Sequence, residues 1–338
     1  MDNLLQKLHK NWDHFQLSTT ADNVKIPTAS RNPLTVVVCV SGGSDSVALL
    51  HLLQRQRTLL NLELHILYLN HQLREEASQE QDFVQSLADL YKIPFHHKTA
   101  KHLKSGQSAL QESAREWRIE ESRKLLKHLG GGRIATGHQA DDQIETLLLK
   151  WLRGTHISNL QGMQWKNESF IRPLLNCRKI ELKENLKTKQ LKWMEDTSNM
   201  STAYMRNRVR IELIPLLDEL TRHGLHSRIN DLSEQSRLLR DFLDSDYENW
   251  QQSLKNTADN SQDVLPVKVL EQANDLLQQE ILHNFITART GKALSYRKLQ
   301  SIFIQLHTGS NHWEMHLSQE WKIRKSGKEL CLQQNQVQ

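Results

Sequence analysis

Hydrophobic and polar positions alternate in blocks along the first half of the chain. Residues 34–40 form a short, β-branched apolar run that is typical of a strand buried on both faces. The next block, 47–60, places Val47, Leu50 and Leu53 on one helical face. The alternation continues for four rounds, with further strands at 62–69, 93–100 and 133–138 and helices at 78–91, 108–129 and 141–153. This order predicts an α/β fold, a parallel sheet with helices on both faces.

The pattern changes after residue 153. Helical periodicity returns in four segments: 176–191, 206–220, 229–254 and 274–290. The second segment carries Pro215, which could bend or end the helix. From residue 312 polar and apolar residues alternate up to a Ser326-Gly327 turn, which predicts a terminal β-hairpin. We therefore expect a smaller, mainly helical C-terminal domain ending in a hairpin. The expected parts are an N-terminal extension with a short amphipathic helix (1–32), an α/β domain (33–217) and the C-terminal domain (218–338).

Composition adds limits to this outline. The chain has 338 residues, of which 38% are hydrophobic, and its mean hydropathy is −0.62. No apolar run approaches the ~18 residues of a membrane span, and the first residues lack the layout of a secretory signal. The three cysteines lie far apart, so neither a disulfide framework nor a zinc site is supported. A cytoplasmic location and no membrane partner are the resulting expectations.

Positive charge is concentrated in one segment. Residues 171–210 hold ten lysines and arginines and four acids, a net charge of +6 against +5 for the whole chain. Arg206, Arg208 and Arg210 close the segment, and in a helix Arg206 and Arg210 share one side. The segment is either a solvated helical face or an electrostatic surface for nucleic acid.

The turn between the first strand and the first helix of the sheet has the sequence Ser-Gly-Gly-Ser-Asp-Ser. Ligands of parallel sheets bind beyond the carboxyl ends of strands, where a glycine pair and a helix N-terminus suit phosphate. The turn comprises Ser41, Gly42, Gly43, Ser44, Asp45 and Ser46. It lacks the lysine of a Walker A loop, and Asp45 would repel phosphate unless a metal joined them. We therefore predict a Mg²⁺–triphosphate site, the alternative being an ordinary helix cap.

A second polar cluster follows the fourth strand. The stretch "HQADDQIET" places Asp142 and Glu145 at i, i+3, on one face of a helix. Acids at a helix start can simply complement the helix dipole. Beyond a strand of a nucleotide-binding sheet, they can instead bind a cationic substrate. His138, at the end of the same strand, is placed to touch a phosphate or a leaving oxygen.

Several motifs together resemble a known family. "SGGSDS" resembles the PP-loop of the ATP pyrophosphatases, and "LNHQLREEASQEQDFV", "ALQESAREWRIEE", "ATGHQADDQIETLLLKWLRGTHISNLQGM", "IRPLL", "EDTSN" and "RNRVRIELIPLL" follow in order. Within that superfamily they resemble tRNA(Ile)-lysidine synthetase, over about residues 34–217. The chain departs from the family pattern at Gln72, where glycine is usual, and at Gln139, where a second histidine is frequent.

The resemblance implies an ATP-dependent ligase. Such an enzyme joins free L-lysine to C2 of the wobble cytidine of the CAU-anticodon isoleucine tRNA, through an adenylated O2, and releases AMP and pyrophosphate. ATP and Mg²⁺ are then required, with the turn holding ATP and Asp45 holding the metal. The resemblance also implies that Asp142 and Glu145 recognise lysine. The C-terminal domain recognises tRNA, and the oligomeric state stays open.

The remaining expected site residues are basic. Arg115 neutralises charge on the adenylate or pairs with Glu112 at the surface. Arg206, Arg208 and Arg210 contact tRNA phosphates.

Two other functions compete with this one. A tRNA thiolase of the same fold would need a persulfide-carrying cysteine or an iron–sulfur cluster, which the isolated cysteines do not favour. A non-enzymatic nucleotide- or RNA-binding protein would have no use for carboxylates opposite a triphosphate.

Overall fold

A computed structural model describes eight stretches of the chain. They are residues 3–18, 33–70, 77–100, 110–155, 159–195, 205–255, 264–291 and 294–335. Contacts divide the chain into two compact units, each treated by itself below. The first comprises Met1–Thr146 with Gly162–His226, and the second comprises Leu147–Gln161 with Ser227–Gln338. Within the described stretches, every helix is too short or too polar to cross a membrane.

The first unit is built on a six-stranded sheet in the order β3-β2-β1-β4-β6-β5. All neighbouring strands run parallel except β5, which is antiparallel to β6. The strands are β1 (Leu34–Cys39), β2 (Leu62–Asn70), β3 (Phe95–Thr99), β4 (Arg133–Ala135), β5 (Lys166–Asn167) and β6 (Phe170–Ile171). The strand order reverses direction between β1 and β4, and a ligand site is expected outside the carboxyl ends there.

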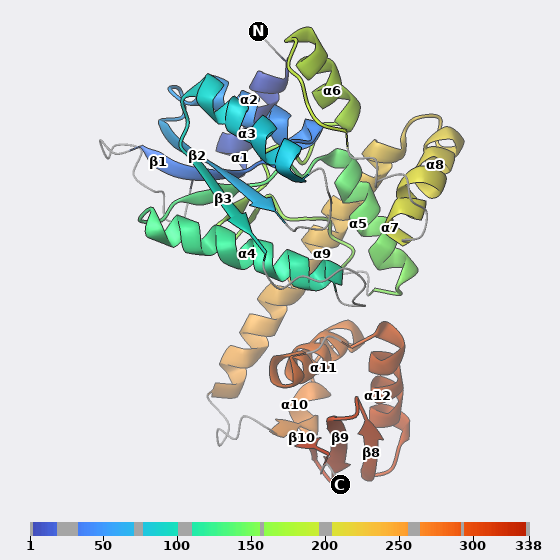
Figure 1. The fold of residues 1–338 in the computed structure, drawn as a ribbon. Helices are drawn as coiled ribbons and strands as arrows, with labels where there is room; N and C mark the ends of the chain where they lie inside the picture. Colours follow the sequence, from blue (N-terminus) through green and yellow to red (C-terminus); the bar gives the residue numbers. More distant parts are fainter. Residues whose placement is uncertain are drawn as a thin grey trace. The chain divides into compact units, whose positions relative to one another are not determined.

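Helices cover both faces of this sheet (Figure 1). Val36 and Val38 of β1 face α2 and α3, whereas Val37 faces Leu126 of α4, because successive strand residues point to opposite sides. The helices of this unit before the basic segment are α1 (Asn3–His14), α2 (Ser44–Gln56), α3 (Ala77–Tyr91), α4 (Leu110–His128) and α5 (Ala140–Leu152), of which the last part, from Leu147, belongs to the second unit. The predicted α/β fold with helices on both faces is confirmed.

The N-terminal helix packs into the first unit. Leu4, Leu8 and Trp12 recur at helical spacing, and all three are buried in the core that contains α2 and β1. Asn11 adds a hydrogen bond from Nδ2 to the backbone oxygen of Pro173 (2.9 Å). The amphipathic helix expected in the N-terminal extension therefore forms part of the sheet domain's core, while residues 19–32 lie outside the described part of the chain.

The basic segment folds into α6 (Lys179–Thr188) and a later helical run. That run comprises α7 (Met205–Arg208), a π-helical turn (Val209–Leu213) and α8 (Ile214–Leu220). Pro215 does not end the helix. It follows a π-helical turn in which the Ile214 N–H donates to the Val209 oxygen, five residues back. The wider π turn directly before it keeps the chain helical from 205 to 220.

The second unit is mixed. Its elements are α9 (Leu225–Lys255), which begins in the first unit, then β7 (Val264–Pro266), α10 (Val267–Leu270), α11 (Asp275–Thr290), α12 (Tyr296–Thr308), β8 (His312–His316), β9 (Trp321–Ser326) and β10 (Glu329–Gln334). Asn274 caps α11 through its side chain, as its place before the helix indicates. The predicted hairpin forms as β9 and β10 around Gly327, but it belongs to a four-stranded antiparallel sheet in the order β7-β10-β9-β8.

Candidate active site

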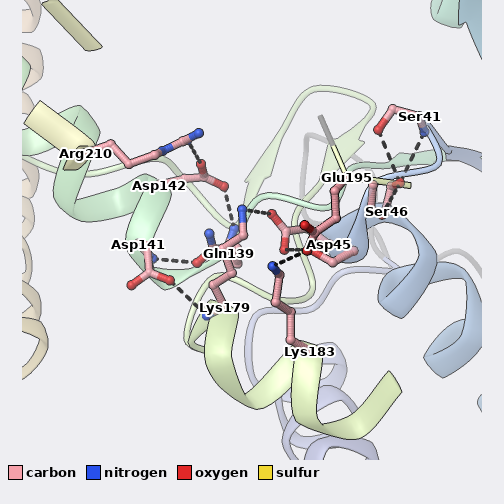
Figure 2. Close-up of polar contacts among 12 residues, drawn as sticks. Ser41, Asp45, Ser46, Gln139, Asp141, Asp142, Lys179, Lys183, Glu195 and Arg210 are labelled. Carbon is pink, nitrogen blue, oxygen red and sulfur yellow. Dashed lines mark hydrogen bonds and ion pairs between the residues drawn. The ribbon is translucent and has the colours of Figure 1, made fainter. Parts of the chain in front are cut away.

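The Ser-Gly-Gly-Ser-Asp-Ser turn connects β1 to α2 at the carboxyl edge of the sheet. Gly42 has φ +88°, a conformation that side chains other than glycine rarely adopt. Ser46 closes the turn, because its hydroxyl accepts a hydrogen bond from the Ser41 backbone N–H (3.2 Å) and donates to the Gly43 oxygen (2.9 Å; Figure 2). The structure thus brings the six predicted residues into one loop ending at a helix N-terminus.

Two other segments close around this turn. Lys179 Nζ, from the start of α6, lies 3.6 Å from the carboxylate of Asp45. The Met194 backbone N–H donates to the Gly42 oxygen (2.9 Å). On the other side, a Cβ added to Gly137 would lie 3.0 Å from the backbone of Asp45 and Ser46, which leaves the loop after β4 little space for anything but glycine.

The acids of α5 are held in different ways. Asp141 accepts from the Lys179 backbone N–H (2.9 Å) and from His226 Nε2 (2.6 Å), so both of its oxygens serve structure. Asp142 accepts a hydrogen bond from the Gln139 backbone N–H (3.0 Å). The Gln139 side chain in turn accepts from the Asp141 N–H (2.6 Å), which orders the loop at the family position where histidine is frequent.

Arg206 and Arg210 converge on the carboxylate of Glu145. Arg206 Nε lies 2.9 Å from Glu145 Oε2, and Arg210 Nη2 lies 3.0 Å from the same oxygen. The Glu145 side chain is 1% exposed, and both arginines also lie within 3.9 Å of Asp142 Oδ1. Sequence reasoning placed the two arginines against tRNA phosphates, but here they contact acids of the candidate site.

Arg208 points elsewhere. Its guanidinium pairs with Glu212, one helical turn later, and its side chain is 56% exposed. Arg206 is almost as exposed, at 49%, but among the described contacts of these three arginines Arg208 is the one without a contact to the acids of α5. The assignment of tRNA phosphates to these arginines stays a prediction.

The site shifts the pKa values of two predicted residues. Burial, followed by the charges of Glu145 and Asp45, raises the pKa of Asp142 to about 6. Burial also lowers the pKa of His138 to about 3, with Arg172, Arg115, Arg206 and Arg118 as further causes. His138 is therefore neutral near pH 7 and acts as a hydrogen-bonding group. Its Nδ1 lies 2.9 Å from Thr136 Oγ1.

Arg115 stands exposed on α4, and an ion pair with Glu112 is not among the contacts of the described residues. Sequence reasoning missed Lys179, Gln139 and His226, which position the acids. It also missed Arg118 and Arg172 near His138. The position of Arg172 in the sequence could have indicated that it lies near the site, since it directly follows a strand that ends at the same sheet edge.

The described residues contain no group of three or more His, Cys, Asp or Glu side chains that could hold a metal by itself. Asp45 is the acid of the turn and keeps 24% of its side chain exposed. Mg²⁺ is usually bound by one or two carboxylates together with substrate phosphates and water. A glycine turn, a helix N-terminus and one accessible carboxylate fit a metal that arrives with a triphosphate.

Residues 16–217 match the PP-loop domain family. The match covers more than half of the chain and includes the glycine turn, the acids of α5 and the arginines that contact them. The fold and the site thus define a PP-loop protein.

Curated relatives indicate which family of PP-loop proteins the chain belongs to. The chain is 34% identical over 213 residues to the tRNA(Ile)-lysidine synthase of Chlorobaculum tepidum, covering 62% of this chain and 64% of that protein. It is 30% identical over 316 residues to the enzyme of the same name from Enterococcus faecalis, covering 90% of this chain and 67% of that protein. The chain belongs to the tRNA(Ile)-lysidine synthase family of PP-loop proteins. It spans about two thirds of the length of these two relatives.

A solved structure agrees on the fold. The U34-tRNA thiolase NcsA from Methanococcus maripaludis, with its 4Fe-4S cluster, matches with a TM-score of 0.53 and 17% identity, over 70% of this chain and 79% of that chain. At this identity the likeness concerns the fold alone.

Proposed function

We propose that this protein uses ATP to ligate free L-lysine to C2 of the wobble cytidine in the CAU-anticodon isoleucine tRNA, forming lysidine. The observation that carries the proposal is the buried carboxylate pair, Asp142 and Glu145, next to the glycine turn. A site that binds only a triphosphate gains nothing from buried acids. A reaction between ATP and an amine requires a phosphate site together with acids that bind the amine. The names of the relatives support the same reaction.

ATP would be bound through its phosphates by the turn. The first N–H groups of α2 have no partner within the helix and point at the edge of the sheet, where they can donate to phosphate oxygens. Asp45 would hold Mg²⁺, which stabilises the charge that develops on the departing pyrophosphate. Lys179, already 3.6 Å from Asp45, would keep positive charge at this position.

Adenylation would convert the cytidine O2 into a leaving group. Oxygen bonded to C2 cannot leave as oxide, but it leaves readily as part of AMP. His138 stands at the end of β4 as a neutral hydrogen-bonding group, placed to contact this oxygen or the α-phosphate. Arg115 would neutralise charge on the adenylate. These two roles are part of the proposal.

The lysine amine must lose a proton before it attacks C2, because its reference pKa is about 10.4. Asp142, with 13% of its side chain exposed, and Glu145, whose oxygens contact Arg206 and Arg210 in this structure, would together bind the ammonium group. Arg206 and Arg210 lie at the same carboxylate, and their positive charge lowers the pKa of an ammonium group beside them. Asp142, whose pKa is raised to about 6, is a stronger base than an ordinary aspartate and would accept the proton.

The tRNA would contact both expected domains. Residues 33–217 would carry the chemistry, and residues 218–338 would add tRNA recognition. Of Arg206, Arg208 and Arg210, Arg208 is the best placed for a phosphate contact, because it is exposed and is not held by Glu145. Within the C-terminal unit, Lys322 and Arg324 of β9 lie on the outer face of the sheet and are further candidates for phosphate contacts.

The direct test is mass analysis of nucleosides from the isoleucine tRNA after incubation with ATP, lysine and the full chain. We expect the cytidine at the wobble position to gain lysine, and AMP to form with it in equal amount. The matched controls omit lysine, or replace the cytidine by uridine. Unmodified tRNA with ATP and lysine present would contradict the proposal.

A thiolation activity fits less well. Burial raises the pKa of Cys39 to about 11 and that of Cys177 to about 12, so neither thiol ionises readily to carry sulfur. The same mass analysis distinguishes the two reactions, because thiolation would add sulfur and not lysine. A non-enzymatic binding protein would leave every nucleoside unchanged.

A further inference from the structure

A group of arginines lies at the carboxyl edge of the sheet, on the face opposite α2. Arg118 is one helical turn before Ser122, whose hydroxyl donates to the Arg118 backbone oxygen (2.7 Å) and lies 3.7 Å from Cys39 Sγ. Cys39 is the last residue of β1. Arg118 therefore projects just beyond the end of β1, and Arg115 lies one turn farther out on the same helix.

Arg172 approaches the same place from β6. The ends of β4 and β6 are joined by a hydrogen bond from the Thr136 N–H to the Ile171 oxygen (3.0 Å), so His138 and Arg172 follow neighbouring strands. Arg172 Nη1 donates to the Gln164 oxygen (2.7 Å), whereas its Nε is buried and finds no hydrogen-bond partner in the described part of the chain. A buried, unpaired guanidinium nitrogen is costly unless a ligand satisfies it.

These arginines differ from Arg206 and Arg210. Among the described residues, no carboxylate lies within 4.0 Å of Arg115, Arg118 or Arg172, whereas Arg206 and Arg210 are held by Glu145. Burial and mutual repulsion lower the pKa of Arg118 and of Arg172, as expected where like charges gather without counter-ions. His138 stays neutral among them, so it adds a hydrogen-bonding group and no repulsive charge.

We propose that Arg118 and Arg172 bind a backbone phosphate of the RNA substrate next to the nucleotide that reacts, while Arg115 keeps its proposed role at the adenylate. Figure 1 shows α2 and α4 on opposite sides of the sheet, and their buried residues pack against alternate residues of β1. The turn before α2 takes the phosphates of ATP. A second phosphate site on the α4 side, at the same edge, suits a phosphate of the other substrate. The RNA must bring its base to the α-phosphate, so its own phosphodiesters are the nearest remaining anions.

This inference rests on the proposed function for the identity of the polymer, but its test does not use lysine or turnover. The probe is a short RNA hairpin with a CAU loop, bound to the full chain without ATP. We expect Arg118→Gln and Arg172→Gln each to weaken binding about tenfold at low salt. Each should also reduce the salt slope, the slope of the logarithm of the binding constant against the logarithm of the salt concentration, by about one in magnitude. Arg118→Lys should restore most of the slope. Arg123→Gln is the matched control, because Arg123 lies on the same helix and pairs with Glu168.

A second arm identifies the phosphate. Hairpins carrying a single uncharged methylphosphonate at each loop position are bound to the native chain and to Arg118→Gln. At one position beside the cytidine, the methylphosphonate should weaken binding to the native chain. The same methylphosphonate should hardly weaken binding to Arg118→Gln any further, because both changes remove the same contact. Additive losses at every position would overturn the proposal. So would an unchanged salt slope in folded Arg118→Gln.

A third arm separates the two sources of phosphate. Binding of a non-hydrolysable ATP analogue is measured without RNA. We expect Arg118→Gln and Arg172→Gln to change it by less than about twofold, against the tenfold change for RNA. Weaker binding of the analogue with unchanged RNA binding would assign the site to ATP and overturn the inference. If lysine is never incorporated while the RNA results hold, the proposed function fails and the phosphate site stands.

Discussion

Replacing Glu145 by glutamine removes the negative charge on which Arg206 and Arg210 converge. The substitution keeps the size of the side chain and one oxygen acceptor, but it leaves two guanidinium groups beside a neutral amide. Glu145 is 1% exposed, and its partners are 49% and 32% exposed, so the lost interactions are partly screened by water. Taking one charge-assisted hydrogen bond at about 1.5–3 kcal/mol as the net loss, we expect a destabilisation of about 2 kcal/mol.

The same change removes the proposed partner of the lysine ammonium. A loss of about 1.5–3 kcal/mol of binding raises the lysine requirement about 10- to 100-fold, while the ATP requirement changes little because the turn is intact. The assays are thermal unfolding and the lysine and ATP dependence of lysidine formation. In a unit of this size, about 2 kcal/mol corresponds to a fall in Tm of about 4–8 °C.

The matched control is Glu212→Gln. Glu212 pairs with exposed Arg208 on the same helical run, so its loss should cost less than about 0.5 kcal/mol and leave the lysine requirement unchanged. Equal increases in the lysine and ATP requirements of Glu145→Gln would refute the assignment of Glu145 to lysine. An unchanged Tm would refute the reasoning on the arginine contacts.

Three further predictions follow from the same geometry. Asp45→Ala should abolish ATP–pyrophosphate exchange and leave RNA-hairpin binding intact, and near-normal exchange would reduce Asp45 to a residue that complements the helix dipole. Asp142→Asn should abolish lysidine formation yet stabilise the protein near neutral pH by about 1–2 kcal/mol. A carboxyl whose pKa is raised from 3.8 to about 6 contributes stability that is fully present below pH 3.8 and is lost as pH rises through 6, so thermal unfolding should show the advantage of the variant vanish below about pH 4. Arg208→Ala should lower the salt slope of RNA binding by about one and leave Tm unchanged, and an unaltered slope would remove this residue from the tRNA surface.

The sheet domain was predictable because its signals are local. Strands such as residues 34–40 are short and apolar throughout, and each is followed by a helix with one apolar face. The C-terminal sheet was harder, because the turn between β8 and β9 contains neither glycine nor proline. The Leu317 and Ser318 N–H groups donate to the Trp321 oxygen (2.9 and 3.1 Å), and the Ser318 hydroxyl accepts from the backbone N–H groups of Glu320 and Trp321 (both 3.2 Å). A serine turn of this kind gives a weak signal in sequence.

The site was predictable in part for the same reason. The spacing of Asp142 and Glu145 is a property of one helix, and so is the shared side of Arg206 and Arg210. Which groups those arginines face is decided by residues about 60 positions away, through the packing of the helical run against α5. Periodicity carries no information about such long-range contacts, so the sequence could place Arg208 on a different side from its two neighbours but could not show what each side contacts.

The close approach of Gly137 to the start of α2 implies thermodynamic coupling between two substrates. The backbone of Asp45 and Ser46, in the proposed ATP site, touches the loop that leads directly into the acids of α5. If ATP shifts this backbone, the affinity for lysine changes by some factor, and lysine must then change the affinity for ATP by the same factor. The affinity for lysine with and without ATP, and the affinity for ATP with and without lysine, should give the same factor, which measures the coupling between the two sites that meet at Gly137.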